Sequence, residues 1–188
     1  PIIAPELGLA AHLVQGFLAS LVFWAGVVAH EFAHALTTRR FGARVYGVLV
    51  TGTGGAALVD QLPDLWHDVL TTLAGPAVNL VAGAGLFWAS WLLPAGAAFS
   101  AVLAPALFMA AVLNIGVGGA NLLPIFPMDG GRALRAALTA AYGDDYKAAL
   151  MARRVSLALS LAAIVAGAAA LPFGWIRTGL LLAGAVFG

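Results

Sequence analysis

Long apolar runs separated by short polar interruptions dominate the pattern of the chain. Crossing the hydrocarbon core of a bilayer takes about 17–25 residues, and four of the runs are long enough to do so. A further apolar run, over residues 176–188, is too short. The pattern predicts a mainly α protein, a polytopic transmembrane helical bundle. Its four full helices are expected over residues 11–40, 69–93, 99–122 and 155–171.

One segment between the runs favours strand instead of helix. Residues 44–51 are rich in valine, Gly52-Thr53-Gly54-Gly55 supplies a turn, and residues 56–59 can return as a second strand. We therefore expect a small β-hairpin at the membrane edge. The other connections are predicted as a solvated loop over residues 61–68, an amphipathic segment up to Tyr142 and a polar stretch over residues 143–154.

Composition supports a membrane protein and excludes several other classes. Hydrophobic residues make up 62% of the chain and charged residues 9%, whereas soluble domains are about a quarter charged. The chain has no cysteine, which rules out disulfides and cysteine-based metal sites. No nucleotide-binding fingerprint is present, and no nucleic acid partner is expected. The length of 188 residues fits a single domain over residues 1–188.

The positions of the basic residues predict an orientation. If the four helices alternate in direction, Arg177 alone among the nine Lys and Arg residues falls on one side of the membrane. The positive-inside rule makes the other side cytoplasmic. The end of the first helix and Asp129 both lie toward that side, so the hairpin is expected at the cytoplasmic membrane edge.

The stretch His30-Glu31-Phe32-Ala33-His34 carries the clearest chemical signal. Histidines four residues apart on a helix project from one face and can bind a single metal ion. Glu31 follows the first histidine, as does the general base in the H-E-x-x-H arrangement of zinc proteases. Ordinary solvated side chains at a helix end are the alternative. Ionisable groups on an apolar, membrane-length segment are costly, however, which favours a functional site.

Asp129 is the best candidate for a third metal ligand. A catalytic zinc ion has three protein ligands and one open position. Asp129 is the only acid between Asp68 and Asp144, and it follows a segment in which two prolines break the third helix. The predicted topology puts it at the same depth as His30 and His34. A carboxylate there would help to neutralise the charge of a metal ion in an apolar setting.

Three motifs together resemble the site-2 protease family of intramembrane zinc metalloproteases, peptidase family M50. They are the H-E-x-x-H of residues 30–34, the sequence Asn-Leu-Leu-Pro-Ile-Phe-Pro-Met-Asp-Gly-Gly of residues 121–131 and the weaker Gly-Pro-Ala-Val-Asn of residues 75–79. The resemblance implies zinc bound by His30, His34 and Asp129, with Glu31 catalytic. It also implies that substrate is handled by Asn79, Asn121, Pro124 and Pro127.

The resemblance further implies regulated intramembrane proteolysis of single transmembrane helices, such as that of an anti-sigma factor or another membrane-tethered regulator. The expected location is a prokaryotic cell membrane, within the lipid bilayer, with the active site toward the cytoplasm. No PDZ or CBS-like domain is evident. The sequence leaves open whether a helix precedes residue 1 and whether the last helix is truncated.

A zinc-binding membrane scaffold and a metal transporter are the alternative functions. The presence of Glu31 argues against the scaffold, because a site that only binds needs no base. A transporter would need further liganding side chains along a transmembrane path, whereas the helices offer mostly Asn, Ser and Thr beyond this cluster.

Overall fold

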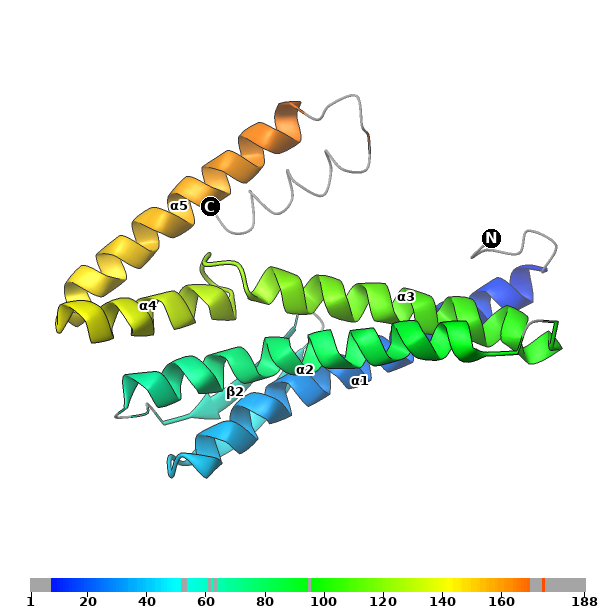
Figure 1. Cartoon of the computed structure of the whole chain (residues 1–188), viewed down its shortest axis with the longest axis horizontal. Helices are drawn as coiled ribbons and strands as arrows, with labels where there is room; N and C mark the ends of the chain where they lie inside the picture. The colour runs from blue at the N-terminus through cyan, green and yellow to red at the C-terminus, as the bar shows by residue number, and fades with distance from the viewer. Residues whose placement is uncertain are drawn as a thin grey trace. The chain divides into compact units, whose positions relative to one another are not determined.

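The computed structural model describes residues 8–51, 54–60, 62, 64–94, 96–169 and 174. Within them, four helices are long and apolar enough to cross a membrane (Figure 1), which confirms the predicted mainly α fold with a small antiparallel hairpin. The predicted short segment over 176–188 lies outside the described residues. In chain order the elements are α1 (Leu9–Arg40), β1 (Val45–Thr51), β2 (Gly54–Val59), α2 (Leu65–Leu92), α3 (Ala98–Asn121), α4 (Asp129–Tyr142) and α5 (Asp145–Ala169).

The chain divides into two compact units. The first contains Pro1–Asp60 and Ala74–Ala120, and the second contains Gln61–Leu73 and Asn121–Gly188. The first unit therefore holds α1, the hairpin, most of α2 and nearly all of α3. The second holds the start of α2 together with α4 and α5. The expectation of a single domain stays a prediction.

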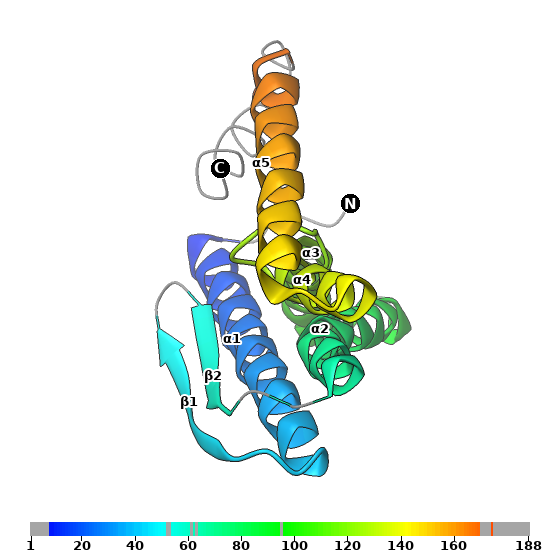
Figure 2. The same ribbon diagram turned by 90° about the vertical axis from the view of Figure 1, so that its left-hand side faces the viewer.

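In the first unit the hairpin lies alongside α1, with β2 nearer to the helix than β1 (Figure 2). The strands pair antiparallel, with Val50 opposite Gly55. At the open end of the hairpin, the Asp60 N–H donates to the Arg44 carbonyl at 3.0 Å. The hairpin is thus a defined structure against the helix that carries the two histidines.

Small residues and buried amides join the helices of this unit. Gly83 on α2 lies so close to α3 that an added Cβ would come within 3.0 Å of the Ile115 side chain. Further along, Gln15 Nε2 on α1 donates to the Ala101 carbonyl on α3 at 2.9 Å. Close approach through glycine and polar bridging are the usual means of holding helices together in a membrane.

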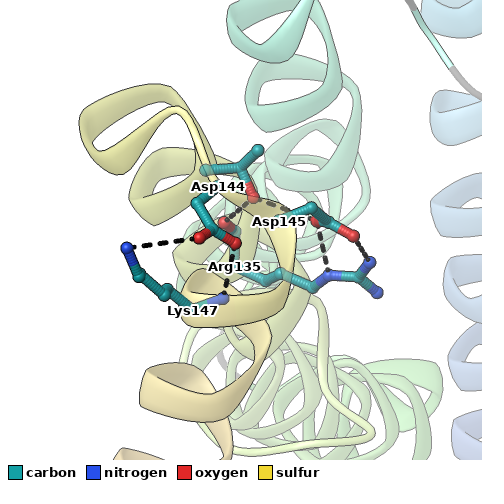
Figure 3. A network of polar contacts seen from close by, with 5 residues as sticks. Arg135, Asp144, Asp145 and Lys147 are labelled. Atoms are coloured by element: carbon teal, nitrogen blue, oxygen red, sulfur yellow. Dashed lines mark hydrogen bonds and ion pairs between the residues drawn. The ribbon is translucent and has the colours of Figure 1, made fainter.

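In the second unit a polar network forms the corner between α4 and α5 (Figure 3). Gly143, in the left-handed conformation with φ 63°, ends α4. Arg135 then holds Asp145, the first residue of α5, through two hydrogen bonds of 3.2 and 2.6 Å. The Arg135–Asp145 pair therefore stabilises the turn between the amphipathic α4 and the apolar α5.

Two helices begin a full turn or more earlier than the sequence pattern predicted. α2 starts at Leu65 instead of residue 69, and α5 at Asp145 instead of residue 155. The reason is capping: Asp64 Oδ1 accepts the N–H groups of Trp66 and His67 at 2.8 and 3.0 Å. Asp144 Oδ1 accepts the Lys147 N–H at 3.0 Å in the same way. Polar residues predicted as a loop and a polar stretch are therefore first turns of helices.

Candidate metal centre

His30, Glu31 and His34 lie buried on α1, at 5%, 6% and 5% exposure. One helical turn separates the two imidazoles, and their Nε2 atoms are 3.1 Å apart. Two nitrogen ligands at about 2.0–2.1 Å from a tetrahedral zinc ion lie about 3.3–3.4 Å from each other. The pair therefore fits a shared metal ion with little adjustment.

Gly75 on α2 provides the space in front of these nitrogens. A Cβ placed on Gly75 would lie within 3.0 Å of Nε2 of both His30 and His34. The imidazoles thus face a point where the opposite backbone carries no side chain. Because any larger residue would fill this space, the glycine suits the close packing of a metal-binding pair.

Asn79 lies one turn further along α2 and is fully buried. Its Oδ1 is 2.5 Å from His30 Nδ1, the ring nitrogen that does not face His34. Its Nδ2 donates to Asn114 Oδ1 on α3 at 2.9 Å. The structure therefore places Asn79 behind the histidine, and its role in handling substrate stays a prediction. Sequence reasoning assigned no role to Asn114.

Glu31 lies against β2 of the hairpin. A Cβ placed on Gly55 would come within 3.0 Å of Glu31 Cγ, Cδ and Oε1. Gly55 belongs to the strand and not, as predicted, to the turn before it. The one available signal was general, because a glycine inside a strand often marks a close approach by another group. Here that group is the predicted base.

Gly55→Ala is expected to reduce peptide cleavage by about 100-fold, because misplacing a reacting group by about 1 Å can cost that much. The added methyl group would displace the Glu31 carboxylate and leave His30 and His34 in place. Cleavage of a co-expressed membrane substrate and zinc per protein would be measured together. Gly47→Ala is the matched control, since a Cβ at Gly47 meets nothing within 4 Å. Equal cleavage by both variants would contradict the role of this contact.

Asp129 is the first residue of α4, in the second unit, and it is 7% exposed. A carboxylate at a helix N-terminus is stabilised by the helix dipole. Gly130 lies against the preceding loop, where a Cβ would come within 3.0 Å of the Leu122 and Leu123 carbonyl oxygens. The loop is held in turn by α5, because the Phe126 N–H donates to Ser156 Oγ at 3.0 Å. Close packing therefore fixes Asp129 within its unit.

The other residues of the third predicted motif share this loop. Asn121 ends α3, Pro124 is partly exposed and Pro127, which follows a cis peptide bond, is exposed. Their predicted role in substrate handling is untested. The structure therefore groups the predicted residues in two sets: His30, Glu31, His34 and Asn79 in the first unit, and Asn121, Pro124, Pro127 and Asp129 in the second.

Comparisons with known proteins agree on one family. The model of peptidase family M50 matches residues 92–163. The chain is 32% identical over 154 residues to the zinc metalloprotease MJ0392 of Methanocaldococcus jannaschii, covering 78% of this chain and 44% of that protein. It is 33% identical over 165 residues to Rip3 of Mycobacterium tuberculosis, covering 87% of this chain and 42% of Rip3.

The fold is also similar to a solved structure, the site-2 protease from Methanocaldococcus jannaschii. The TM-score is 0.65 at 27% sequence identity, over 90% of this chain and 77% of that one. The fold and its membrane-length helices define an integral membrane protein, and the relatives named above are zinc metalloproteases. These matches identify the chain as a relative of peptidase family M50 and of the site-2 proteases. It spans less than half the length of the curated relatives described above.

Proposed function

We propose that this chain is the catalytic part of a zinc metalloprotease that cleaves peptide bonds within or near transmembrane segments. The observation that carries the proposal is the buried pair of histidines on a membrane-length helix, with Nε2 atoms 3.1 Å apart and Glu31 beside them. Ionisable side chains within a membrane-length helix are costly, so their presence there indicates a functional site. The similarity to family M50 and to the zinc metalloprotease MJ0392 supports the same activity.

His30, His34 and Asp129 would hold the zinc ion. Two imidazoles and one carboxylate are a common donor set for catalytic zinc, and each of the three side chains is buried and offers one ligand atom. The placement of Asp129 beside the histidines is part of the proposal and rests on the family motif. Zinc bound there would polarise the scissile carbonyl and make water a better nucleophile.

Glu31 would act as the proton carrier of the reaction. Its carboxylate takes a proton from the attacking water and delivers it to the leaving amine, so that one group serves as base and then as acid. The helix places it directly after His30, and β2 lies against its side chain at Gly55. This packing limits the directions in which the carboxylate can turn.

The substrate would be a single transmembrane helix that unwinds before it is cut. Its backbone amides leave their own hydrogen bonds on unwinding and need new partners in an apolar setting. The described residues form a sheet of only two strands, so β1 and β2 each keep an outer edge. We propose that an unwound substrate pairs with such an edge by strand addition, helped by Asn121 and the loop of Pro124 and Pro127.

The partners and location follow from the same proposal. A membrane-tethered regulator such as an anti-sigma factor fits a protease whose site is buried at membrane depth. The bias of basic residues toward one side supports a site that faces the cytoplasm. The similarity to proteins from Methanocaldococcus jannaschii and Mycobacterium tuberculosis supports a prokaryotic cell membrane.

Cleavage of a co-expressed single-span membrane protein tests the proposed function. The full-length protein would be expressed with a panel of tagged single-span proteins, and membranes would be incubated with and without a zinc chelator. Chelator-sensitive cleavage inside or beside the transmembrane segment is the expected result. Stoichiometric zinc without cleavage of any panel member would favour the scaffold, and protein without zinc would overturn the metal site.

Proline at Val48 or Val50 of β1 is expected to impair cleavage far more than insertion or zinc binding. Proline removes a backbone donor and is poorly tolerated inside a strand. Val45→Pro is the control, because proline is accepted at the first residue of a strand. Wild-type cleavage by inserted, zinc-loaded variants at both Val48 and Val50 would rule out strand addition.

A further inference from the structure

A chain of hydrogen bonds runs from the backbone of α3 to the histidine face of α1. Asn114 Nδ2 donates to the Ala110 carbonyl at 2.8 Å. Asn79 Nδ2 donates to Asn114 Oδ1 at 2.9 Å, and Asn79 Oδ1 lies 2.5 Å from His30 Nδ1. Both asparagines are fully buried, so their amides depend on these partners instead of on bulk water.

The direction of every bond in this chain follows from its first member. A backbone carbonyl can only accept, so the amide nitrogen of Asn114 must face Ala110 and its oxygen must face Asn79. That oxygen needs a donor, which turns Nδ2 of Asn79 toward it. Oδ1 of Asn79 then faces His30 and can only accept. His30 Nδ1 must therefore carry the hydrogen.

This assignment leaves His30 Nε2 without a hydrogen. In a neutral imidazole one ring nitrogen donates and the other offers a lone pair, and only the lone pair can bind a metal ion. Nε2 is the atom that lies 3.1 Å from His34 Nε2 and faces Gly75. The chain of amides thus selects the tautomer that is ready to bind metal.

We propose that Asn114 is a positioning residue for the metal centre: acting through Asn79, it holds His30 in the Nδ1–H tautomer. The inference rests on the proposed zinc site. Gly26 on α1 supports it, because a Cβ there would lie within 3.0 Å of Asn114 Oδ1. Gly26 therefore leaves room on the histidine helix for the Asn114 side chain, although Asn114 does not itself reach the metal-binding nitrogens.

Zinc affinity of the full-length protein tests this proposal. Asn114→Leu keeps the approximate volume and removes both hydrogen-bonding groups, so Asn79 can turn its nitrogen toward His30. Loss of such an outer-shell partner typically weakens metal binding by about 10–100-fold, and that is the expected loss, measured by competition with a chelator. Unchanged affinity would overturn the proposal.

Gln15→Leu is the matched control, because it also removes a buried amide that joins α1 to α3 but lacks a contact with His30. Its zinc affinity is expected to stay within about twofold of wild type, well below the outer-shell effect. An equal loss in both variants would mean that helix packing alone was disturbed. In an Asn79→Ala background, Asn114→Leu should cost nothing further, and an additive loss would also overturn the proposal.

The tautomer can be observed directly in the wild-type protein, which covers the case that Asn114→Leu does not fold. Nitrogen-15 NMR of histidine-labelled, zinc-free protein, with His30 assigned by substitution, should show a hydrogen on Nδ1. A hydrogen on Nε2 would overturn the proposal. A wild-type protein that binds no zinc would contradict the proposed function, whereas zinc binding that is indifferent to Asn114 would contradict only this inference.

Discussion

Glu31→Gln is expected to lower cleavage by about 10²–10⁴-fold, the usual contribution of a general acid–base group. The amide has the size and shape of the carboxylate, so it fits the same space against Gly55. It cannot take a proton from water at neutral pH. Zinc content should stay at the wild-type level, because His30 and His34 are untouched. The rate of appearance of the cleaved, tagged substrate and the zinc content per protein provide the two measurements.

Asp64→Asn is the control for this change. It makes the same conversion of carboxylate to amide, at the exposed residue that caps α2. Asparagine caps a helix about as well as aspartate, so folding and cleavage should both be unchanged. Cleavage at the wild-type rate by the Glu31→Gln variant would show that another group carries the proton.

The metal-binding helix is open to prediction from sequence because its features are local. His30, Glu31 and His34 follow one another on a single helical turn, and the spacing alone sets their relation. The structure agrees, with Nε2 atoms 3.1 Å apart. The loop before Asp129 is similar in kind, since its two prolines and the Gly-Gly that follows define a helix break within one short segment.

The contacts behind His30 are not predictable in this way, because they depend on how helices pack. Asn79 is 49 residues from His30 in the sequence, and Asn114 is a further 35 residues along. A buried amide in an apolar run signals that it has a partner and does not identify it. Gly55 is a similar case. The glycine-rich segment that contains it predicts a turn, whereas its position against Glu31 depends on the pairing of the hairpin.

The early starts of α2 and α5 show a different kind of limit. Asp64 and Asp144 are recognisable capping residues, so the signal for a helix start is present in the sequence. A prediction from the apolar pattern alone misses it, because the first turns of both helices contain charged side chains. A membrane helix can begin outside the apolar core, and hydropathy marks only the part within it.

Gly75→Ala is expected to weaken zinc binding by at least about 100-fold, the upper end of the cost of outer-shell changes, because both ligating nitrogens are displaced. The new methyl group would come within 3.0 Å of Nε2 of both His30 and His34. The imidazoles would have to turn away from each other, and proteolysis would be lost with the metal. Zinc affinity and cleavage would be measured in parallel on the purified full-length protein.

The same substitution should not weaken the helix itself, which separates the metal effect from misfolding. Replacing glycine by alanine inside a helix stabilises it by about 0.5–1 kcal/mol. Gly85→Ala makes the identical change on α2, where a Cβ meets nothing within 4 Å, and should keep full zinc binding and activity. A zinc-loaded, active Gly75→Ala protein would show that the histidines do not face α2 as described. Loss of zinc in both variants would instead point to a general sensitivity of this helix.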